Sequence, residues 1–221
     1  MLVKTFKRIP KHIGIIPDGN RRWAQKNGFK KQDGYSFGVE PGYDVYRLCL
    51  DLGVKEITFY GFTIDNTKRA SEQIKAFQKA CIDAVEAVAN KDADILVIGN
   101  TKSPLFPKEL SFYTERKKFG KSLIKINFLV NYGWDWDLNR PSKETYFNLN
   151  GNIIKGIASS PISMMDLIIR WGGMRRLSGF LPIQSVYADF YIVDEMWPDY
   201  SQEQFYKALD WYQNQDITRG G

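Results

Sequence analysis

The sequence predicts an α/β fold in a single domain over residues 1–221, with a mostly parallel central sheet flanked by helices. Two observations lead to this prediction. Short apolar runs typical of strands alternate along the chain with longer segments whose apolar residues recur at helical spacing. The 221 residues, 43% of them hydrophobic, are enough for one large domain with a substantial core, and no repeat or linker indicates a second.

The expected elements follow in order. A strand over 12–17 leads into a helix over 18–31 with Gly28 at its end. The next helix tolerates Pro41 in its first turn and is capped by Gly53. Apolar residues at helical spacing predict the third helix. The expected strands cover residues 12–17, 54–62, 94–99, 124–130, 166–170 and 188–193, and the expected helices cover 18–31, 39–52, 71–90, 107–119 and 201–215. Residues 131–160 are expected to be irregular because Pro141 and several asparagines and glycines interrupt them.

Composition narrows the classes of function. A net charge of +6 and a pI near 9.1 favour anionic partners. No block of lysine and arginine exceeds three residues, so the charge is dispersed and nucleic-acid binding is not expected. No apolar run is long enough to span a bilayer and the first residues lack a signal peptide's apolar core. We therefore expect a cytoplasmic protein with at most peripheral membrane association.

The few cysteines and histidines exclude several chemistries. Two cysteines and one histidine cannot form a zinc cluster. Cys49 and Cys81 lie on apolar helix stripes and are expected to be buried and reduced. His12 stands at a strand entrance with no serine motif near it, which argues against a Ser-His-Asp triad.

The segment from Asp18 to Arg22 is the first candidate site. This segment lies where an apolar strand ends and a helix begins, and it supplies an acid, a glycine and an amide in Asp18, Gly19 and Asn20. Two arginines, Arg21 and Arg22, follow and add full positive charges. Helix N-termini and arginines bind anions, whereas a carboxylate among them indicates a divalent cation. A diphosphate bound together with Mg²⁺ would account for both the anion-binding groups and the carboxylate. The alternative is that Asp18 is only a helix cap and the arginines are solvated.

The segment from Arg170 to Ser178 is the second candidate. Two glycines allow the backbone to approach a ligand, and arginines match phosphate oxygens bidentately. Arg170 and Arg176 are the favoured ligands, and Arg175 is read as a surface residue. Two anion sites imply two phosphorylated substrates or one substrate with two anionic ends. The chain has neither a Walker A loop nor a G-x-G-x-x-G motif, so ATP and NAD are poor candidates.

Polar residues that follow expected strands are predicted to meet in one active site, because ligands bind at the carboxyl ends of parallel strands. These residues are Asp18, Thr63, Asn66, Asn131 and Arg170.

Together, these motifs resemble those of the cis-prenyltransferases, the undecaprenyl diphosphate synthase family. They occur in the same order as in the family and extend over nearly the whole chain. The resemblance rests on residues 12–24, Phe62 to Asn66 with Arg69, Asn131-Tyr132-Gly133, residues 166–178, residues 184–191 and Trp197 to Tyr200. It implies the undecaprenyl diphosphate synthase-like fold, a homodimer, a Mg²⁺ cofactor, and allylic and homoallylic prenyl diphosphates as substrates.

The resemblance also implies residue roles. Asp18 and Asn66 are the implied catalytic residues, with Asn66 near the point of proton removal, and Asp18 with Asp189 is the implied metal site. Asp189 stands where the family carries a glutamate. The implied substrate-binding residues are Gly19, Asn20, Arg21, Arg22, Trp23, Lys31, Tyr35, Thr63, Arg69, Arg170, Arg176 and Ser178.

Departures from the family pattern indicate a short product. Arg21, Lys31, Tyr35, Thr67 and Met174 replace the residues usual in the family, and the segment between residues 131 and 166 is shorter. An aromatic set is expected to block the tunnel that holds the growing chain, although ordinary core packing would also explain each member. The set is Tyr35, Phe37, Tyr43, Tyr46 and Phe128.

Two rival functions stay open. The pattern around Arg21 and Tyr35 is similar to a subgroup that includes cyclolavandulyl diphosphate synthase, which joins two dimethylallyl diphosphates irregularly. A non-catalytic binding subunit is the second rival, and the retained Asp18, Asn66 and Arg170 argue against it.

Overall fold

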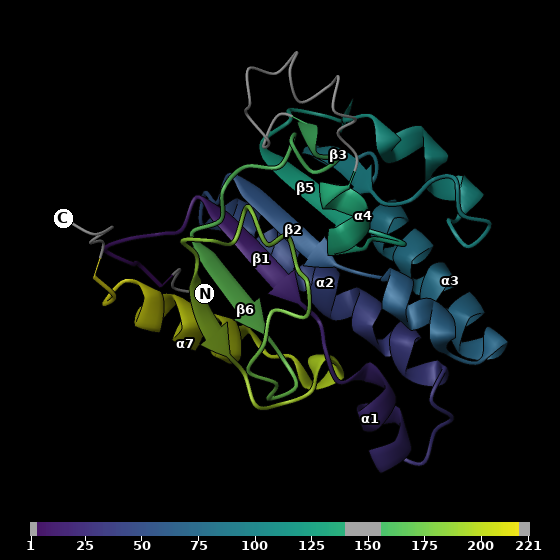
Figure 1. Ribbon diagram of the computed structural model, residues 1–221. Coiled ribbons are helices and arrows are strands. Elements are labelled where there is room, and N and C mark those ends of the chain that lie inside the picture. The colour runs from purple at the N-terminus through teal and green to yellow at the C-terminus, as the bar shows by residue number, and fades with distance from the viewer. Residues whose placement is uncertain (1–3, 140–155, 217–221) are drawn as a thin grey trace.

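The computed structural model describes residues 4–139 and 156–216, which form a seven-stranded sheet with helices packed on it (Figure 1). The strand order is β4-β3-β5-β2-β1-β6-β7, and only the β3–β4 pair is antiparallel. The predicted mostly parallel α/β fold is confirmed. The strands are β1 (His12–Ile16), β2 (Glu56–Tyr60), β3 (Ala93–Ile98), β4 (Lys117–Lys118), β5 (Ile124–Leu129), β6 (Leu167–Arg170) and β7 (Asp189–Ile192).

The helices differ in how well the sequence predicted them. Those expected over 39–52, 71–90 and 201–215 are present, and α7 begins with a capping box in which Ser201 accepts from the Gln204 N–H. The α-helices are α1 (Asn20–Lys26), α2 (Val39–Asp51), α3 (Ser71–Val88), α4 (Trp134–Leu138) and α7 (Gln202–Tyr212). Short 3₁₀ helices, η1 (Asp33–Gly38), η2 (Ile64–Lys68), η3 (Lys108–Thr114) and η4 (Trp197–Asp199), complete the described elements.

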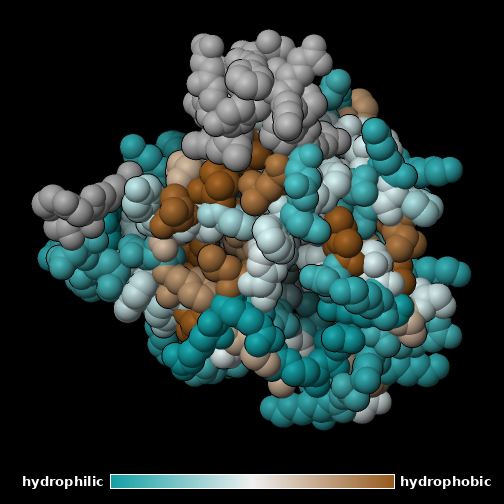
Figure 2. Space-filling model, viewed as in Figure 1, coloured by the Kyte–Doolittle hydropathy of each residue, from teal (hydrophilic) through white to brown (hydrophobic). Residues whose placement is uncertain are grey.

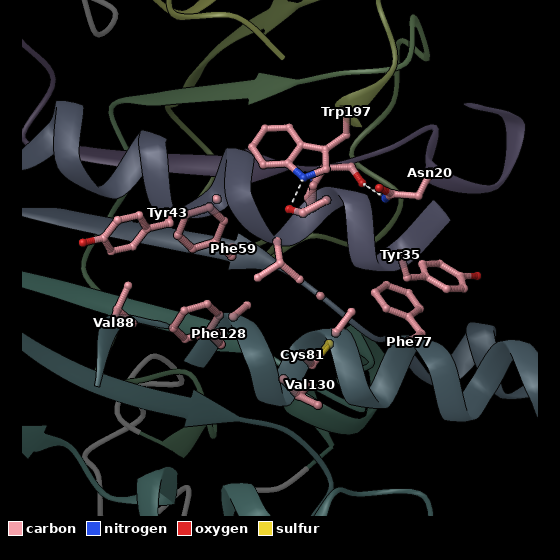
Figure 3. A pocket seen from close by; sticks show the side chains of 17 residues that line it. Asn20, Tyr35, Tyr43, Phe59, Phe77, Cys81, Val88, Phe128, Val130 and Trp197 are labelled. Carbon is pink, nitrogen blue, oxygen red and sulfur yellow. Dashed lines mark hydrogen bonds between the residues drawn. The ribbon is translucent and has the colours of Figure 1, made fainter. Parts of the chain in front are cut away.

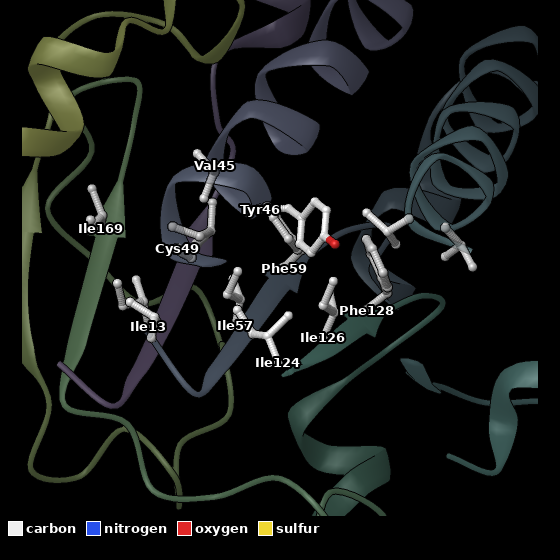
Figure 4. Packing of buried hydrophobic residues seen from close by; sticks show 14 of the residues in the cluster. Ile13, Val45, Tyr46, Cys49, Ile57, Phe59, Ile124, Ile126, Phe128 and Ile169 are labelled. Carbon is white, nitrogen blue, oxygen red and sulfur yellow. The ribbon is translucent and has the colours of Figure 1, made fainter. Parts of the chain in front are cut away.

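The two faces of the sheet carry separate cores. On one face, alternate strand residues such as Ile13, Ile57 and Phe128 pack against α2, α3 and α7 (Figure 4). On the other, Ile16, Tyr60 and their neighbours pack against α4 and irregular segments near Ile162 and Phe180. Strands β1, β2, β3 and β6 are therefore buried on both sides, as is typical of parallel strands, whereas the edge strands β4 and β7 are partly exposed. Among the described residues, no helix has the length and apolar character needed to cross a membrane.

Three expected elements were wrong in part. The helix expected over 107–119 is the 3₁₀ helix η3 followed by strand β4, because Lys117 and Lys118 pair with β3. Sheet pairing overrides helix propensity there. The helix expected over 18–31 spans only Asn20–Lys26, and the chain then turns through Gly28 at φ 78°. Part of the expected irregular segment 131–160 is helix α4; residues 140–155 lie outside the described residues.

The register of the sheet brings the candidate segments together. Ile16 of β1 aligns with Arg170 of β6, so the chain leaves both strands at the same edge. A short parallel bridge joins Thr63 to Tyr132 after β2 and β5. All five residues predicted to converge therefore lie at or just past the carboxyl ends of strands on this edge. Asn131 is buried there and donates to the Asn100 carbonyl at 3.1 Å.

Candidate active site

An open cavity of about 380 Å³ lies at the carboxyl edge of the sheet, and we call it the polar cavity. It brings together the two segments that the sequence singled out, and its lining contains five arginines and two carboxylates, Asp18 and Asp65. The predicted site residues that line it are Asp18, Gly19, Asn20, Arg21, Arg22, Tyr35, Thr63, Asn66, Arg69, Arg170, Arg176 and Ser178.

Asp18 joins the two predicted anion sites. Its Oδ2 accepts from Arg170 Nη2 at 2.8 Å, and its Oδ1 lies 3.6 Å from Arg22 Nη2. Arg170 is only 5% exposed and also donates to Ser178 Oγ at 2.9 Å. Its Nε–H has no partner among the described residues. Arg170 Nη1 also donates to the Arg176 carbonyl, so three acceptors hold the guanidinium in place, and a fixed guanidinium is suited to bind an anion.

Two glycines allow the segments to approach one another. Gly19 adopts φ 104°, and its N–H donates to Asp18 Oδ1 at 2.6 Å. A side chain on Gly172 would collide with Arg22, whose Nη2 donates to the Gly172 carbonyl at 2.9 Å. Because α1 has only seven residues, the positive charge of the cavity comes chiefly from arginine side chains rather than from the helix end.

Arg69 and Tyr35 also line the polar cavity and contact each other. Arg69 Nη1 donates to the Tyr35 hydroxyl at 2.7 Å, and the Tyr35 ring stacks on Phe77 with centroids 4.4 Å apart. Burial lowers the pKa of Arg69, and nearby Arg21 lowers it further. Burial raises the pKa of Tyr35. Tyr35 is therefore neutral and can donate its hydroxyl hydrogen, and it accepts from Arg69, which forms no salt bridge within residues 4–139 and 156–216.

Asn66 has a structural role as well as a place in the cavity. Its Oδ1 accepts from the Thr63 N–H at 3.1 Å, which caps η2 reciprocally. Tyr60, which the sequence analysis missed, also lines the cavity, and its hydroxyl donates to the Ser178 carbonyl at 2.8 Å. The one sequence signal for Tyr60 was its place near the end of a predicted strand. That position alone does not distinguish a site residue from a core residue.

A second cavity, which we call the apolar cavity, adjoins the first and measures about 70 Å³. Both cavities share the walls Pro17, Asn20, Tyr35, Gly61 and Phe77. From there the apolar cavity runs between α2, α3 and the sheet, and Figure 3 shows Tyr43, Phe59, Val88 and Phe128 at the end away from Asn20 and Tyr35.

The inner end of the apolar cavity is aromatic. The rings of Phe59 and Phe128 stack with centroids 5.4 Å apart. Of the predicted aromatic set, Tyr35, Tyr43 and Phe128 line the cavity. Phe37 is instead exposed at the surface, and Tyr46 is buried outside the lining. Phe59 was missed because its position inside a strand resembles ordinary core.

The structure does not bring three predicted site residues to the polar cavity. The Trp23 ring packs on Phe29, and its Nε1 donates to Asp199 at 2.6 Å. Lys31 is exposed in the turn before η1. Asp189 begins β7 and aligns with Leu167.

Asp189 lies away from Asp18 within one chain. Asp189 is three residues, roughly 10 Å, from the carboxyl end of its strand, so it lies toward the opposite edge of the sheet from Asp18. Burial raises the pKa of Asp189, opposed by Arg8. Among the described residues, no three histidine, cysteine, aspartate or glutamate side chains gather into a metal-binding group. Asp18 is thus the one predicted metal ligand at the cavity.

The other titratable candidates keep structural roles. His12 is buried at the amino end of β1, where its Nε2 lies 2.8 Å from Thr58 Oγ1, and burial lowers its pKa. Cys49 and Cys81 are free and buried, as predicted, and burial raises the pKa of Cys81 to about 12.

Comparison with known proteins decides the family. A family model described as putative undecaprenyl diphosphate synthase matches residues 16–220. The chain belongs to the cis-prenyltransferase (undecaprenyl diphosphate synthase) family. It is 32% identical to an isoprenyl transferase of Clostridium acetobutylicum over 98% of this chain and 92% of that one. It is 30% identical to a ditrans,polycis-undecaprenyl-diphosphate synthase ((2E,6E)-farnesyl-diphosphate specific) of Buchnera aphidicola, covering 99% and 96%.

The fold of this cis-prenyltransferase matches a solved member. Lavandulyl diphosphate synthase from Lavandula x intermedia, in complex with dimethylallyl diphosphate, superposes with a TM-score of 0.79. The match covers 94% of this chain and 96% of that one at 22% identity, which establishes the shared fold. The family relationship makes the protein a prenyltransferase, with isoprenoid diphosphates as the class of substrate.

Proposed function

We propose that this prenyltransferase condenses an allylic prenyl diphosphate with isopentenyl diphosphate and releases a short product with a new cis double bond. One observation supports the proposal above the others. Two arginine-bearing segments meet at Asp18 in the polar cavity, and that cavity shares walls with the apolar cavity.

The residues divide into two subsites. Arg21, Arg22 and Arg69, with the Tyr35 hydroxyl, bind the allylic diphosphate beside the shared wall, so that its hydrocarbon tail enters the apolar cavity. Arg170, Arg176 and Ser178 bind the second diphosphate. The reacting carbons then lie between the subsites, near the shared Asn20 and Gly61, where proximity lowers the barrier.

Breaking the bond between the allylic carbon and its diphosphate requires stabilisation of the negative charge that develops on the diphosphate. The carbon–oxygen bond of the allylic substrate breaks, the double bond of isopentenyl diphosphate attacks that carbon, and a proton is lost to complete the new alkene. Fixed cations at the departing diphosphate stabilise the charge that develops there. Asn66 lies close enough to orient the second substrate, and the departing diphosphate is the available acceptor of the proton.

The proposed reaction uses Mg²⁺ as its cofactor. Asp18 offers one half-exposed carboxylate, and Mg²⁺ commonly takes one or two carboxylates with substrate phosphates and water. Asp18 therefore fits as the ligand that would hold the ion against the diphosphate. Bound there, Mg²⁺ would neutralise charge on the leaving group.

A radiochemical assay tests the proposed activity. Incorporation of labelled isopentenyl diphosphate into butanol-extractable product should require an allylic diphosphate and Mg²⁺, and should stop when EDTA is added. Incorporation that persists in EDTA would contradict the role of Mg²⁺, and none under any condition would contradict the condensation.

Irregular coupling of two dimethylallyl diphosphates is the second candidate. It is favoured by the name of the solved relative, a lavandulyl diphosphate synthase, and by Arg21, an additional cation at the allylic subsite. Arg21 Nη1 donates to Gln73 Oε1 at 3.2 Å, which holds the guanidinium at the cavity. The absence of any need for isopentenyl diphosphate would identify this reaction.

Substitution of the arginines tests the second subsite. Arg170→Ala and Arg176→Ala should each raise the KM for isopentenyl diphosphate about tenfold to a hundredfold, because a charge-assisted hydrogen bond contributes roughly 1.5–3 kcal/mol. Arg175→Ala is the matched control, since Arg175 is exposed and does not line the cavity. Steady-state kinetics with varied isopentenyl diphosphate measures the effect. An unchanged KM in both variants would assign these arginines to structure.

A cytoplasmic homodimer completes the proposal, on the support of the family resemblance alone. Light scattering should give twice the mass of the 25.6 kDa chain. A monomeric mass at micromolar concentration would contradict the dimer, and recovery only in a membrane fraction would contradict the location.

A further inference from the structure

Three aromatic rings next to the site entrance have no role in the activity proposed above. Trp23 of α1, Phe29 and Phe37 contact one another, with ring centroids 4.7–5.9 Å apart. Phe29 is 46% exposed and Phe37 is 43% exposed. We call these three side chains the aromatic patch. In Figure 1, α1 lies at the periphery of the molecule, away from the sheet.

The aromatic patch is surrounded by positive charge. Residues 21–31 contain five basic side chains and no acidic one. Lys26, Lys30 and Lys31 are all exposed. Figure 2 shows a largely hydrophilic surface where α1 lies in Figure 1. Two carboxylates are nearby but engaged, since Asp33 accepts from the Lys30 N–H at 3.1 Å and Asp199 accepts from Trp23.

We infer that the aromatic patch and its lysines dock the protein on an anionic lipid surface. Aromatic side chains suit the interface between headgroups and acyl chains, and lysines near an anionic membrane add roughly 1 kcal/mol each. An exposed apolar cluster with a polar rim is typical of an interaction site.

The arrangement of the rings favours lipid over nucleic acid. Bases bind to proteins by stacking on open aromatic faces. Here the Trp23 and Phe29 rings are nearly parallel, with an interplanar angle of 8°, and Phe37 packs against both. Contacts within the patch occupy part of each ring, which leaves less ring surface for stacking with a base.

The position of the patch also suits a lipid surface. α1 begins at Asn20, which lines both cavities, and Trp23 follows within one turn. Docking through the patch would bring the entrance of the site to the membrane, where an amphiphilic prenyl product partitions. Lipid binding itself can be measured without assuming the proposed reaction.

Vesicle co-sedimentation of the full chain tests the inference. Wild-type protein should sediment with phosphatidylcholine vesicles containing phosphatidylserine, bind pure phosphatidylcholine weakly, and lose affinity as salt rises. The double variants Phe29→Ser/Phe37→Ser and Lys26→Gln/Lys30→Gln should each lower the affinity at least about tenfold.

Phe112→Ser is the matched control. Phe112 is 59% exposed and contacts an aromatic ring and a lysine, but Glu109 and Glu115 stand close to it in sequence. Its variant should bind as the wild type does, and thermal unfolding should show all variants folded. Failure of wild-type protein to bind anionic vesicles, or equal binding by both double variants, would overturn the inference. Retention of a single-stranded oligonucleotide with no vesicle binding would overturn it in favour of nucleic acid.

Discussion

Replacing Asp18 with alanine should lower kcat by at least about a hundredfold while the protein stays folded. The variant removes the one predicted metal ligand at the cavity and the acceptor that holds Arg170 Nη2 at 2.8 Å. Metal and electrostatic stabilisation of a departing diphosphate contribute several kcal/mol to the transition state. Single-turnover measurements with saturating substrates would report the loss directly.

Two further variants separate catalysis from folding. Asp18→Asn keeps the shape and one hydrogen-bond acceptor, so Arg170 stays oriented while the charge is lost; its kcat should fall almost as far. Asp65→Ala is the matched control, because Asp65 lines the same cavity but pairs only with exposed Lys68 at 2.9 Å. It should stay close to wild type. If Asp18→Ala retains more than about a tenth of the wild-type rate, Asp18 is not a metal ligand in the reaction.

Replacing Phe128 with alanine should lengthen the product by one or more five-carbon units. Phe128 stacks on Phe59 at the inner end of the apolar cavity, and a packed wall cannot admit another isoprene unit. We expect the wild type to make products of about ten to twenty carbons, and the product distribution of the variant should move above that range. Mass spectrometry of the extracted products measures the change.

Phe106→Ala is the matched control for length. Phe106 and Phe128 are both 5% exposed and belong to the same core, but only Phe128 lines the cavity. Either substitution is expected to cost about 3–5 kcal/mol of stability, so Phe128→Leu serves if the alanine variant is poorly folded. Phe106→Ala should leave product length unchanged. Unchanged products from both Phe128 variants would assign Phe128 to the core alone.

The sequence predicted the sheet better than it predicted the connections. Strands such as β1 and β3 are buried along their whole length, so their apolar runs mark them clearly. The 3₁₀ helix η3 was mistaken for an α-helix because the pairing of β4 with β3 depends on residues distant in the chain. Helix α1 was predicted to be longer than it is, because no local signal before Gly28 indicates that the helix ends at Lys26.

The site was predicted from types of residue and their place at strand ends. Asp18 and Arg170 were found because parallel strands end at one edge, and the register puts them in contact. Asp189 was assigned by resemblance alone, and its register with Leu167 places it toward the other edge. Tyr60 and Phe59 were not predicted as site residues. They are neighbours in one strand and line different cavities. The alternation of residues along a strand does not show which face of the sheet borders a cavity.

Mass analysis of the products made from dimethylallyl diphosphate, with and without carbon-13-labelled isopentenyl diphosphate, tests the central claim most directly. Regular cis-condensation predicts no product from dimethylallyl diphosphate alone. With both substrates it predicts a short prenyl diphosphate that carries one label for each unit added. An unlabelled ten-carbon product from dimethylallyl diphosphate alone would contradict regular condensation and establish irregular coupling.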